Sequence, residues 1–493
     1  MSETWLLPAA LATPWSAIGG ILLLRRNANI REGVSLVAAA VLLGLVIALL
    51  PRVTAGERPA AEIFEIFPGI AFAFHAEPLG VVFALIVAFL WFITVLYSIG
   101  YMRAHGEAHQ TRFYAFFAAA IAAAIGGALA ANLLTLYLFY EVLTLATYPL
   151  VAHGGQDKDR AGARVYLSIL LGTSLIFLLM ALAWTYSLTG TLTFTDGGLF
   201  RVDGGMIPGA SPLTLSLIFV LFLFGTGKAA LMPFHRWLPA AMVAPTPVSA
   251  LLHAVAVVKL GVFAVLKVAV YIFGLDTLSG SLGATAMQYV AAATLLLAAV
   301  YALREDNLKR RLAYSTISQL AYIVLAATLA NQISLVAGGM HIAAHAFAKI
   351  TLFFCAGMIL VSLHKTDVSE LHGVGRAMPV TLTAWIVASL CVIGLPLTGG
   401  FWSKWYLVRG AWEADEPLMM AVILLGSLLA VGYLLAPAAR ALHAGPAGQR
   451  PAEAGAPEAP RISLLALSTT AAMTVLLFFA APPLLRFLDG YVN

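Results

Sequence analysis

Six ionisable side chains stand inside long apolar runs of this sequence, namely Glu141, Lys228, Lys259, Lys267, Lys349 and Lys404. A charged side chain at the centre of a membrane helix costs roughly 2.5 to 3.5 kcal/mol on insertion scales. Six ionisable side chains at such positions in one chain predict an intramembrane path for protons or other ions. Lys267 is near the end of its run, and we expect its ammonium to reach the membrane surface by snorkelling.

Glu141 is the only acidic residue of the six and stands in LYLFYEVLTLATYPL. Its charge requires a cation, which predicts a contact with a buried lysine; a purely structural ion pair between two helices is the alternative. At about 4 Å and an effective dielectric near 20, such a pair gains about 4 kcal/mol. Moving one charge through 100 mV is worth about 2.3 kcal/mol, so a pair that opens and closes has the strength to gate a proton.

Lys228 stands in LFLFGTGKAALMPFHRWLP, where two glycines precede it and Pro233 follows it. This composition predicts a helix that is broken inside the membrane, since proline removes a backbone donor. The segment after the break contains His235 and Arg236, which we take as candidates for the entrance on the cytoplasmic side. The alternative for Arg236 is a positive anchor at the membrane surface.

A second interrupted run, LCVIGLPLTGGFWSKWYLVRG, places Pro396 and two glycines shortly before Lys404. Two broken segments in corresponding halves are typical of inverted-repeat transporters. The two breaks fall in the seventh and the twelfth predicted crossings, an offset of five, and this odd number predicts that the second unit is upside down relative to the first.

Histidines accompany two of the lysines. MHIAAHAFAKITLFF places His341, His345 and Lys349 on one helical face, and His253 and Lys259 stand on another run, where both could border a water-filled cavity. Histidine titrates near neutrality, which suits a proton relay. A hydrogen-bonded histidine pair in the core is the alternative, and a zinc site is not expected because no further ligand accompanies the pair.

The elements that must position these residues are long apolar helices. Of the 493 residues, 61% are hydrophobic and 10% are charged, which excludes a water-soluble domain and predicts an all-α polytopic membrane protein with about fourteen crossings. The predicted crossings run from Trp5 to Leu24, Gly33 to Leu50, Leu79 to Met102, Phe113 to Ala131, Leu133 to Ala152, Val165 to Gly190, Pro212 to Leu231, Val248 to Gly274, Gly283 to Leu303, Leu312 to Ala330, Ser334 to Leu363, Met378 to Trp405, Leu418 to Ala439 and Ile462 to Leu485.

The positive charges predict an orientation. Of the 28 Lys and Arg residues, 18 fall in loops on one side, five are the buried lysines, and five (Arg52, Arg58, Arg201, Arg409 and Arg486) fall on the other side. By the positive-inside rule the side with 18 is cytoplasmic. Both termini are then periplasmic or extracellular, in a bacterial inner membrane.

Several kinds of site lack their sequence signature. There is no glycine-rich nucleotide loop and no paired cysteine motif, and Cys355 and Cys391 fall inside apolar runs as small core residues. We therefore expect no cofactor, no metal, no disulfide and no nucleic-acid partner. The net charge of +5 divides into basic inner loops, acidic outer segments and a row of buried lysines, so it does not predict an anionic ligand.

The motifs resemble those of the antiporter-like proton-conducting subunits shared by Mrp-type sodium/proton antiporters, respiratory complex I and membrane-bound hydrogenases. The resemblance is carried by YEVLTLATYPL, GKAALMPFHRWLPAAMVAPTPVSALLHA, KRRLAYSTISQLAY, HIAAHAFAKITLFF and GLPLTGGFWSKWYL. It implies two inverted five-helix repeats, each with a broken helix. It further implies a Glu141–Lys228 pair, a central relay through Lys259 and Lys349 with histidines, and Lys404 near the exit.

The resemblance also implies a domain plan. Residues 1–112 form helices one to three, 113–274 the first repeat of helices four to eight, and 283–439 the second repeat of helices nine to thirteen. The Pro, Gly and Ala content of GPAGQRPAEAGAPEAP predicts a flexible cytoplasmic loop at 440–461, which precedes the last helix at 462–493.

The resulting hypothesis is a proton-translocating subunit, with or without Na⁺ exchange, of a multisubunit Mrp-type antiporter, with other membrane subunits as partners. A pumping subunit of a redox-driven complex is the first alternative, in which case the chain belongs to a translocating enzyme without carrying its cofactors. A stand-alone solute transporter and a purely structural subunit are the others.

Overall fold

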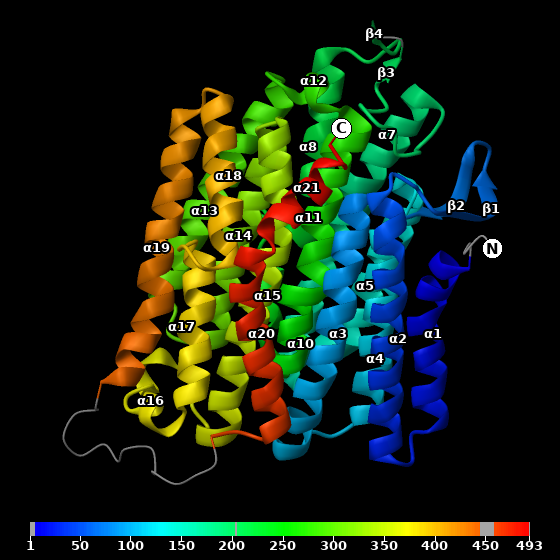
Figure 1. Ribbon diagram of the computed structural model, residues 1–493. Coiled ribbons are helices and arrows are strands. Elements are labelled where there is room, and N and C mark those ends of the chain that lie inside the picture. Colours follow the sequence, from blue (N-terminus) through cyan, green and yellow to red (C-terminus); the bar gives the residue numbers. More distant parts are fainter. Residues whose placement is uncertain (1–4, 203–204, 444–457, 493) are drawn as a thin grey trace.

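The protein, described by a computed structural model for residues 5–202, 205–443 and 458–492, is a bundle of long helices that run roughly side by side (Figure 1). The prediction of a flexible loop at 440–461 concerns mainly residues 444–457, which lie outside the described residues. Two short antiparallel hairpins, β1 (Ala60–Phe67) with β2 (Ile70–His75) and β3 (Arg201–Val202) with β4 (Gly205–Met206), lie at one end of the bundle.

The first half of the chain contains α1 (Leu6–Leu23), α2 (Ala28–Thr54), α3 (Pro78–Ala104), α4 (Gln110–Ala128), α5 (Leu133–Val151), α6 (Asp157–Thr173), the π-helical turn η1 (Ser174–Leu178), α7 (Leu179–Thr189), α8 (Pro212–Gly225), η2 (Gly227–Ala229), α9 (Trp237–Ala240), η3 (Ala241–Val243), α10 (Thr246–Ala250), η4 (Leu251–Val255), α11 (Val257–Lys267) and η5 (Val268–Phe273).

The second half contains α12 (Leu275–Leu278), α13 (Leu282–Arg304), α14 (Leu308–Thr328), α15 (Gln332–Leu363), η6 (Val368–Glu370), α16 (Val374–Ala377), α17 (Pro379–Ile393), α18 (Gly399–Glu413), α19 (Pro417–Leu442), α20 (Arg461–Phe479) and α21 (Ala481–Asp489).

Eleven helices of the described residues are long and apolar enough to cross a membrane, and the fold is that of a polytopic all-α membrane protein. The other three predicted runs coincide with α8, with α14 and with α17 followed by α18. These are shorter or more polar, and the number of fourteen crossings stays a prediction. Local signals place many helix starts: asparagine caps such as Asn132, whose side chain accepts from Thr135 N–H, and prolines in the first turn.

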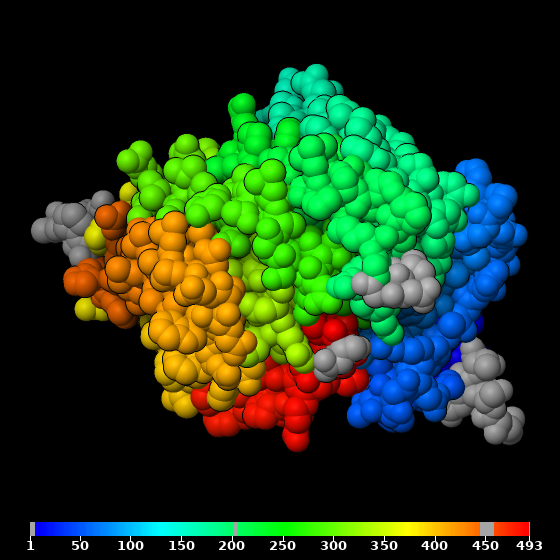
Figure 2. All heavy atoms as spheres, turned by 90° about the horizontal axis from the view of Figure 1, so that it is seen from above, coloured from blue at the N-terminus to red at the C-terminus, as the bar shows by residue number. Residues whose placement is uncertain are grey.

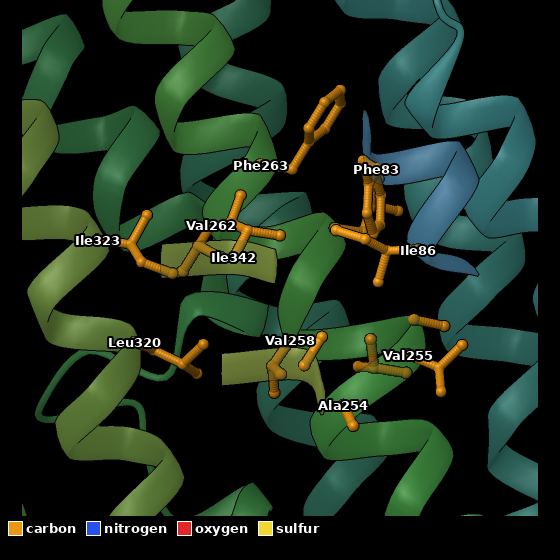
Figure 3. Close-up of a cluster of buried hydrophobic side chains, with 14 of the residues drawn as sticks. Phe83, Ile86, Ala254, Val255, Val258, Val262, Phe263, Leu320, Ile323 and Ile342 are labelled. Carbon is orange, nitrogen blue, oxygen red and sulfur yellow. The ribbon is translucent and has the colours of Figure 1, made fainter. Parts of the chain in front are cut away.

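The element α10–η4–α11–η5 lies at the centre of the bundle and is buried along its whole membrane-length window. Its apolar side chains pack against α3, α14 and α15 in a dense cluster (Figure 3). In this cluster the rings of Phe83 and Phe263 lie 4.9 Å apart. The outer helices α1, α2, α19 and α20 present more of their surface, as expected for helices that face lipid.

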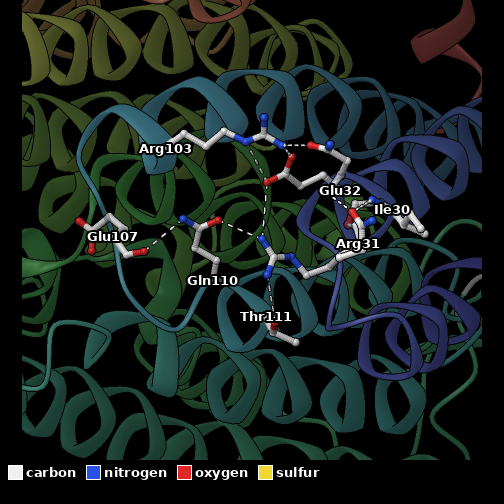
Figure 4. Close-up of polar contacts among 10 residues, drawn as sticks. Ile30, Arg31, Glu32, Arg103, Glu107, Gln110 and Thr111 are labelled. Atoms are coloured by element: carbon white, nitrogen blue, oxygen red, sulfur yellow. Dashed lines mark hydrogen bonds and ion pairs between the residues drawn. The ribbon is translucent and has the colours of Figure 1, made fainter.

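A polar network joins α2, α3 and α4 at the end of the bundle opposite the hairpins (Figure 4). Arg31 of α2 donates to Thr111 Oγ1 at 3.0 Å and to Gln110 Oε1 at 2.9 Å, and Glu32 forms an ion pair with Arg103 of α3. Arg31 and Glu32 are only 6% and 2% exposed. Because buried charges are tolerated when they are paired, this network fixes α2 against α3 and α4.

The hairpin of β1 and β2 has no counterpart among the elements predicted from the sequence, in which residues 51–78 connect two helices. The signal was present, since AAEIFEIFPGIAFAFH has repeated β-favouring residues around a Pro68–Gly69 turn. Gly69 has φ +78°, the left-handed conformation that such a turn requires. The last predicted run also differs, because it ends at Phe479 and is followed by the short helix α21.

Gly400 provides a test of how tightly the second break is packed. A Cβ at this position would lie 1.8 Å from the carbonyl oxygen of Cys391, whereas a Cβ at Gly44 of α2 would meet nothing within 4 Å. We expect Gly400→Ala to destabilise the protein by about 1–3 kcal/mol, as overpacking does, and Gly44→Ala to be neutral or stabilising. Thermal unfolding in detergent measures both, and equal stabilities would contradict the packing described.

Candidate functional site: a buried line of titratable side chains

Lys228 lies on the interruption that follows α8. The α-helix ends at Gly225, the single turn η2 contains Lys228, and helical structure resumes only at Trp237. The ammonium of the fully buried Lys228 donates to Tyr140 O at 2.8 Å and to Thr144 Oγ1 at 2.6 Å, and lies 3.1 Å from the centroid of the Tyr140 ring. Neutral acceptors and an aromatic face thus satisfy this cation.

Glycines bring neighbouring helices against this break. A Cβ at Gly225 would lie 2.4 Å from the Leu178 nitrogen, and a Cβ at Gly261 would lie 2.6 Å from the Lys228 carbonyl carbon. The absence of a side chain at Gly261 allows α11 to touch the backbone of the break. Gly225 and Gly227 were interpreted from the sequence as loosening the helix, and the structure adds that both sit where another chain segment comes too close for a side chain.

Glu141 does not touch Lys228 in this structure. Among the described residues, both carboxylate oxygens of Glu141 lack a hydrogen-bond partner, and no ion pair within 4.0 Å includes them. Glu141 is partly exposed and shares a face of α5 with Leu138 and Leu145, which are 38% and 56% exposed. Its two carboxylate oxygens are nevertheless buried, so the acid group points into the protein without forming an ion pair with Lys228 within 4.0 Å.

Lys259 and His345 meet at the centre of the molecule, where the Lys259 ammonium contacts His345 Nδ1. Both residues are buried, and they come from the central α11 and from α15. The π-helical turn η4 just before α11 contains His253, whose two ring nitrogens lack partners among the described residues. Such turns change the helical register, so sequence spacing alone could not give the faces of His253 and Lys259.

The stripe on α15 extends in both directions from this contact. The rings of His341 and His345 are stacked with centroids 6.0 Å apart, and His341 Nδ1 lies 2.9 Å from Ser403 Oγ. One turn beyond His345, Lys349 donates to Ser315 Oγ at 2.6 Å. The three residues predicted to share a face do so, and each reaches a different neighbouring helix.

Beside Lys349, α14 and α19 contain buried polar groups without partners among the described residues. These are Ser318 Oγ, both polar atoms of Gln319, and the hydroxyl of Tyr433. Buried polar groups that lack protein partners are where structures hold ordered water. The surroundings of Lys349 are therefore polar, and the Tyr433 hydroxyl lies close to the side chains of Ser315, Ser318 and Gln319.

Lys404 of α18 lies next to the second break. The helix α17 ends at Ile393, the chain passes through Pro396 without helical structure, and α18 begins at Gly399. The Lys404 ammonium reaches back to Ile393 O at 3.2 Å, donates to Ser427 Oγ at 2.9 Å and lies 4.4 Å from the Tyr322 ring centroid. Since that ring also stacks on His341, aromatic contact links Lys404 to the histidine pair.

The entrance candidates are less buried. Arg236 is exposed, whereas His235 is partly buried and its Nδ1 lacks a partner among the described residues. Both lie between η2 and α9, beside Pro233. No group of three or more His, Cys, Asp or Glu side chains in the described part of the chain is arranged to hold a metal ion.

The prediction for Lys267 was wrong. Its side chain is fully buried and forms an ion pair with Glu77 Oε1 at 3.0 Å, while its ammonium also donates to Ala130 O at 3.0 Å and lies 4.0 Å from the Phe194 ring centroid. Snorkelling fails because β2, α3 and the segment after α7 cover the end of the central element.

Glu77 is a buried acid that the sequence analysis missed, since it precedes an apolar run instead of standing within one. It is 0% exposed, and Tyr271 donates its hydroxyl to the second carboxylate oxygen. Burial and the Lys267 ammonium lower the pKa of the neighbouring His75, in β2, to about 4. This imidazole is therefore neutral near pH 7, and Glu77 balances Lys267 without a further cation from His75.

Fold and site together define a class of protein: a polytopic helical membrane protein with two interrupted segments and a row of buried lysines and histidines between them. The chain belongs to the family described as NADH:quinone oxidoreductase/Mrp antiporter, TM, whose model matches residues 130–430. A second model, described as NADH-Ubiquinone oxidoreductase (complex I), chain 5 N-terminus, matches residues 68–114. The expected family is thereby confirmed.

Curated relatives agree with this membership. The chain is 32% identical over 422 residues to NADH-quinone oxidoreductase subunit N of Desulforudis audaxviator, covering 85% of this chain and 82% of that protein. It is 30% identical over 371 residues to NAD(P)H-quinone oxidoreductase chain 5 of Synechocystis, covering 71% of this chain and 52% of the relative. The chain thus spans about half the length of the chain 5 relatives that it matches.

Two solved structures share the fold. A chain of the Mrp complex from Dietzia sp. superposes with a TM-score of 0.86 at 21% identity, covering 100% of this chain and 97% of that chain. A chain of the membrane-bound sulfane sulfur reductase, an archaeal respiratory membrane complex, gives a TM-score of 0.84 at 22% identity, covering 99% and 97%.

The Glu77–Lys267 pair yields a stability prediction. Lys267→Met leaves a buried carboxylate without its cation, and we expect it to cost about 3–5 kcal/mol, because an unpaired buried charge is expensive. The double variant Glu77→Gln/Lys267→Met should recover much of this loss. Thermal unfolding in detergent measures the stability of the wild type, of each single variant and of the double variant. Arg409→Gln, which breaks the exposed pair with Glu413, should cost less than about 1 kcal/mol, and a Lys267→Met variant no worse than this control would contradict the prediction.

Proposed function

We propose that this chain moves protons across the membrane along the buried line, as a subunit of a multisubunit Mrp-type cation/proton antiporter or a related complex. The observation that carries the proposal is that the buried titratable side chains contact one another in an unbroken series from Lys404 to Lys259. Lys404, the Tyr322 ring, His341, His345 and Lys259 follow one another through direct contacts across four helices. Side chains that titrate, spaced by hydroxyls and unpartnered polar groups, are what proton hopping through water requires.

The first half of the proposed path runs through Glu141 and Lys228. Lys228 here donates to neutral acceptors and not to Glu141, which corresponds to the open state of the expected gate. Closing the gate would bring an attraction of about 4 kcal/mol at about 4 Å and an effective dielectric near 20. This is the same order as the energy of one charge in a membrane potential.

Other membrane subunits are the expected partners, because a curated relative of this chain is a subunit of a larger assembly. The matched structures are chains of multisubunit complexes, consistent with this assembly.

We propose the two inverted repeats at 113–274 and 283–439 as the frame of the path. Each span contains one interrupted helix with a buried lysine beside it, α8–η2 with Lys228 and α17–α18 with Lys404. Lys404 donates to Ile393 O at the end of α17, and Lys228 donates to oxygens of the neighbouring α5. An interrupted helix in each of two repeats is also found in transporters whose binding sites lie at the membrane midplane.

A redox-driven complex is the second candidate for the assembly. The 32% identity to a subunit of NADH-quinone oxidoreductase and the shared fold with a chain of a sulfane sulfur reductase favour it. In either assembly the work of this chain is the same, because the driving reaction would be supplied by other subunits.

Transport assays test the line directly. In vesicles containing the assembled complex, Lys228→Met should lower proton-coupled transport at least tenfold, because methionine keeps the side-chain length but cannot carry a proton. Lys158→Met, at an exposed lysine in the first turn of α6, should retain activity. Transport by Lys228→Met at the control rate would refute the relay and favour a structural subunit, and transport of a solute by the chain alone would favour the stand-alone alternative.

We also propose that the hairpins and both termini face the periplasm of a bacterial inner membrane, as the distribution of arginine and lysine indicates. Cys355 and Cys391 are buried, so an introduced surface cysteine can be labelled selectively. Glu62→Cys in the hairpin should react with a membrane-impermeant maleimide from the periplasmic side, and Arg26→Cys in the α1–α2 turn only after the inner membrane is permeabilised. The reverse labelling pattern would show that the chain has the opposite orientation in the membrane.

A further inference from the structure

A hollow of about 580 Å³ lies where α2 ends, α3 begins and α21 crosses the bundle end. Its wall is apolar and includes Leu50, Val53, Pro483 and Phe487. Arg58 and Arg486 also line it, and no acidic side chain does so among the described residues. Figure 2 shows the C-terminal segment, in red, near a blue part of the chain at this end of the molecule.

The charges around the hollow are unbalanced. Arg58 lies 4.0 Å from Glu77 Oε2, but Glu77 is already paired with Lys267 at 3.0 Å. Arg486 is exposed, and no ion pair within the described residues includes it. Two cations, Lys267 and Arg58, therefore share one carboxylate, while Arg486 has no ion-pair partner among the described residues, so the two arginines on the rim are the ones open to a ligand. Arginine binds phosphate with two parallel hydrogen bonds.

The shape of the hollow matches the charge pattern. The arginines lie at the ends of membrane helices, where lipid headgroups are found, and the apolar wall continues from them along α2. A ligand with an anionic phosphate and hydrocarbon chains satisfies both parts. A free phosphate would leave the apolar wall uncovered.

We propose that this hollow is a binding site for one anionic phospholipid, with its phosphate on Arg58 and Arg486 and its acyl chains against Leu50, Val53 and Phe487. The lipid holds α21 against α2 and α3. It also places a negative charge beside Arg58, within reach of the buried Glu77–Lys267 pair. The site is independent of the relay residues and of the proposed transport.

Lipid titration of the detergent-solubilised full chain tests the site, with thermal stability and native mass spectrometry as readouts. We expect phosphatidylglycerol to bind and stabilise, whereas phosphatidylcholine with the same acyl chains and inorganic phosphate should not. Arg58→Gln/Arg486→Gln should weaken phosphatidylglycerol binding at least tenfold, about the loss of one charge-assisted contact. The control Arg409→Gln/Arg461→Gln removes two charges elsewhere and should change binding less than twofold.

Arg486→Gln alone provides a second variant, since Arg486 is exposed and its replacement breaks no ion pair of the described residues. It should also weaken binding by several-fold. Equal binding by all variants would overturn the proposal, as would equal stabilisation by inorganic phosphate, which would indicate a simple anion site. Binding by the isolated chain that disappears in the intact complex would also overturn it, and would assign the arginines to an acidic segment of a partner subunit.

Discussion

The constraint on which this structure depends is the cost of placing an ammonium group in a medium without water. Each buried lysine has acceptors from the chain itself: a carbonyl and a threonine for Lys228, a carbonyl and a serine for Lys404, a serine for Lys349, a histidine for Lys259. Both helix breaks lie beside lysines with such acceptors. The helix interruptions, the hydroxyl side chains and the aromatic faces therefore all lower the cost of burying an ammonium group. The irregular backbone at the breaks is tolerated because it is buried in protein.

The buried lysines were predictable because a charge in a long apolar run is visible in the sequence. The same holds for His341, His345 and Lys349, whose spacing on one helix already places them on one face. Glu77 was not visible in this way, because its burial results from the packing of β2, α3 and the end of the central element around it. Lys267 was misjudged for the same reason, since its place at a helix end predicts exposure only if nothing covers that end.

Other features needed tertiary structure. The π-helical turns η4 and η5 change the register of the central element, and the residue types of LLHAV and VAVYIF do not predict such turns. The contact between Lys259 and His345 depends on how two distant helices pack. Glu141 and Lys228 could be proposed as partners from their charges, but the face on which each lies relative to the other follows only from the packing of α5 against the break.

Phe263 stands four residues after Lys259 and four before Lys267, on the same face of α11, and packs against Phe83 of α3. An apolar layer of this kind behaves as the dielectric of a capacitor between two more polar regions. The transmembrane voltage falls mainly across the parts of a protein that hold no mobile charge, so this layer would carry a large share of it once water reaches the polar groups on both sides. Lys259 and Lys267 would then lie at different electrical potentials although they share one helix, and each 100 mV between them is worth about 2.3 kcal/mol per charge.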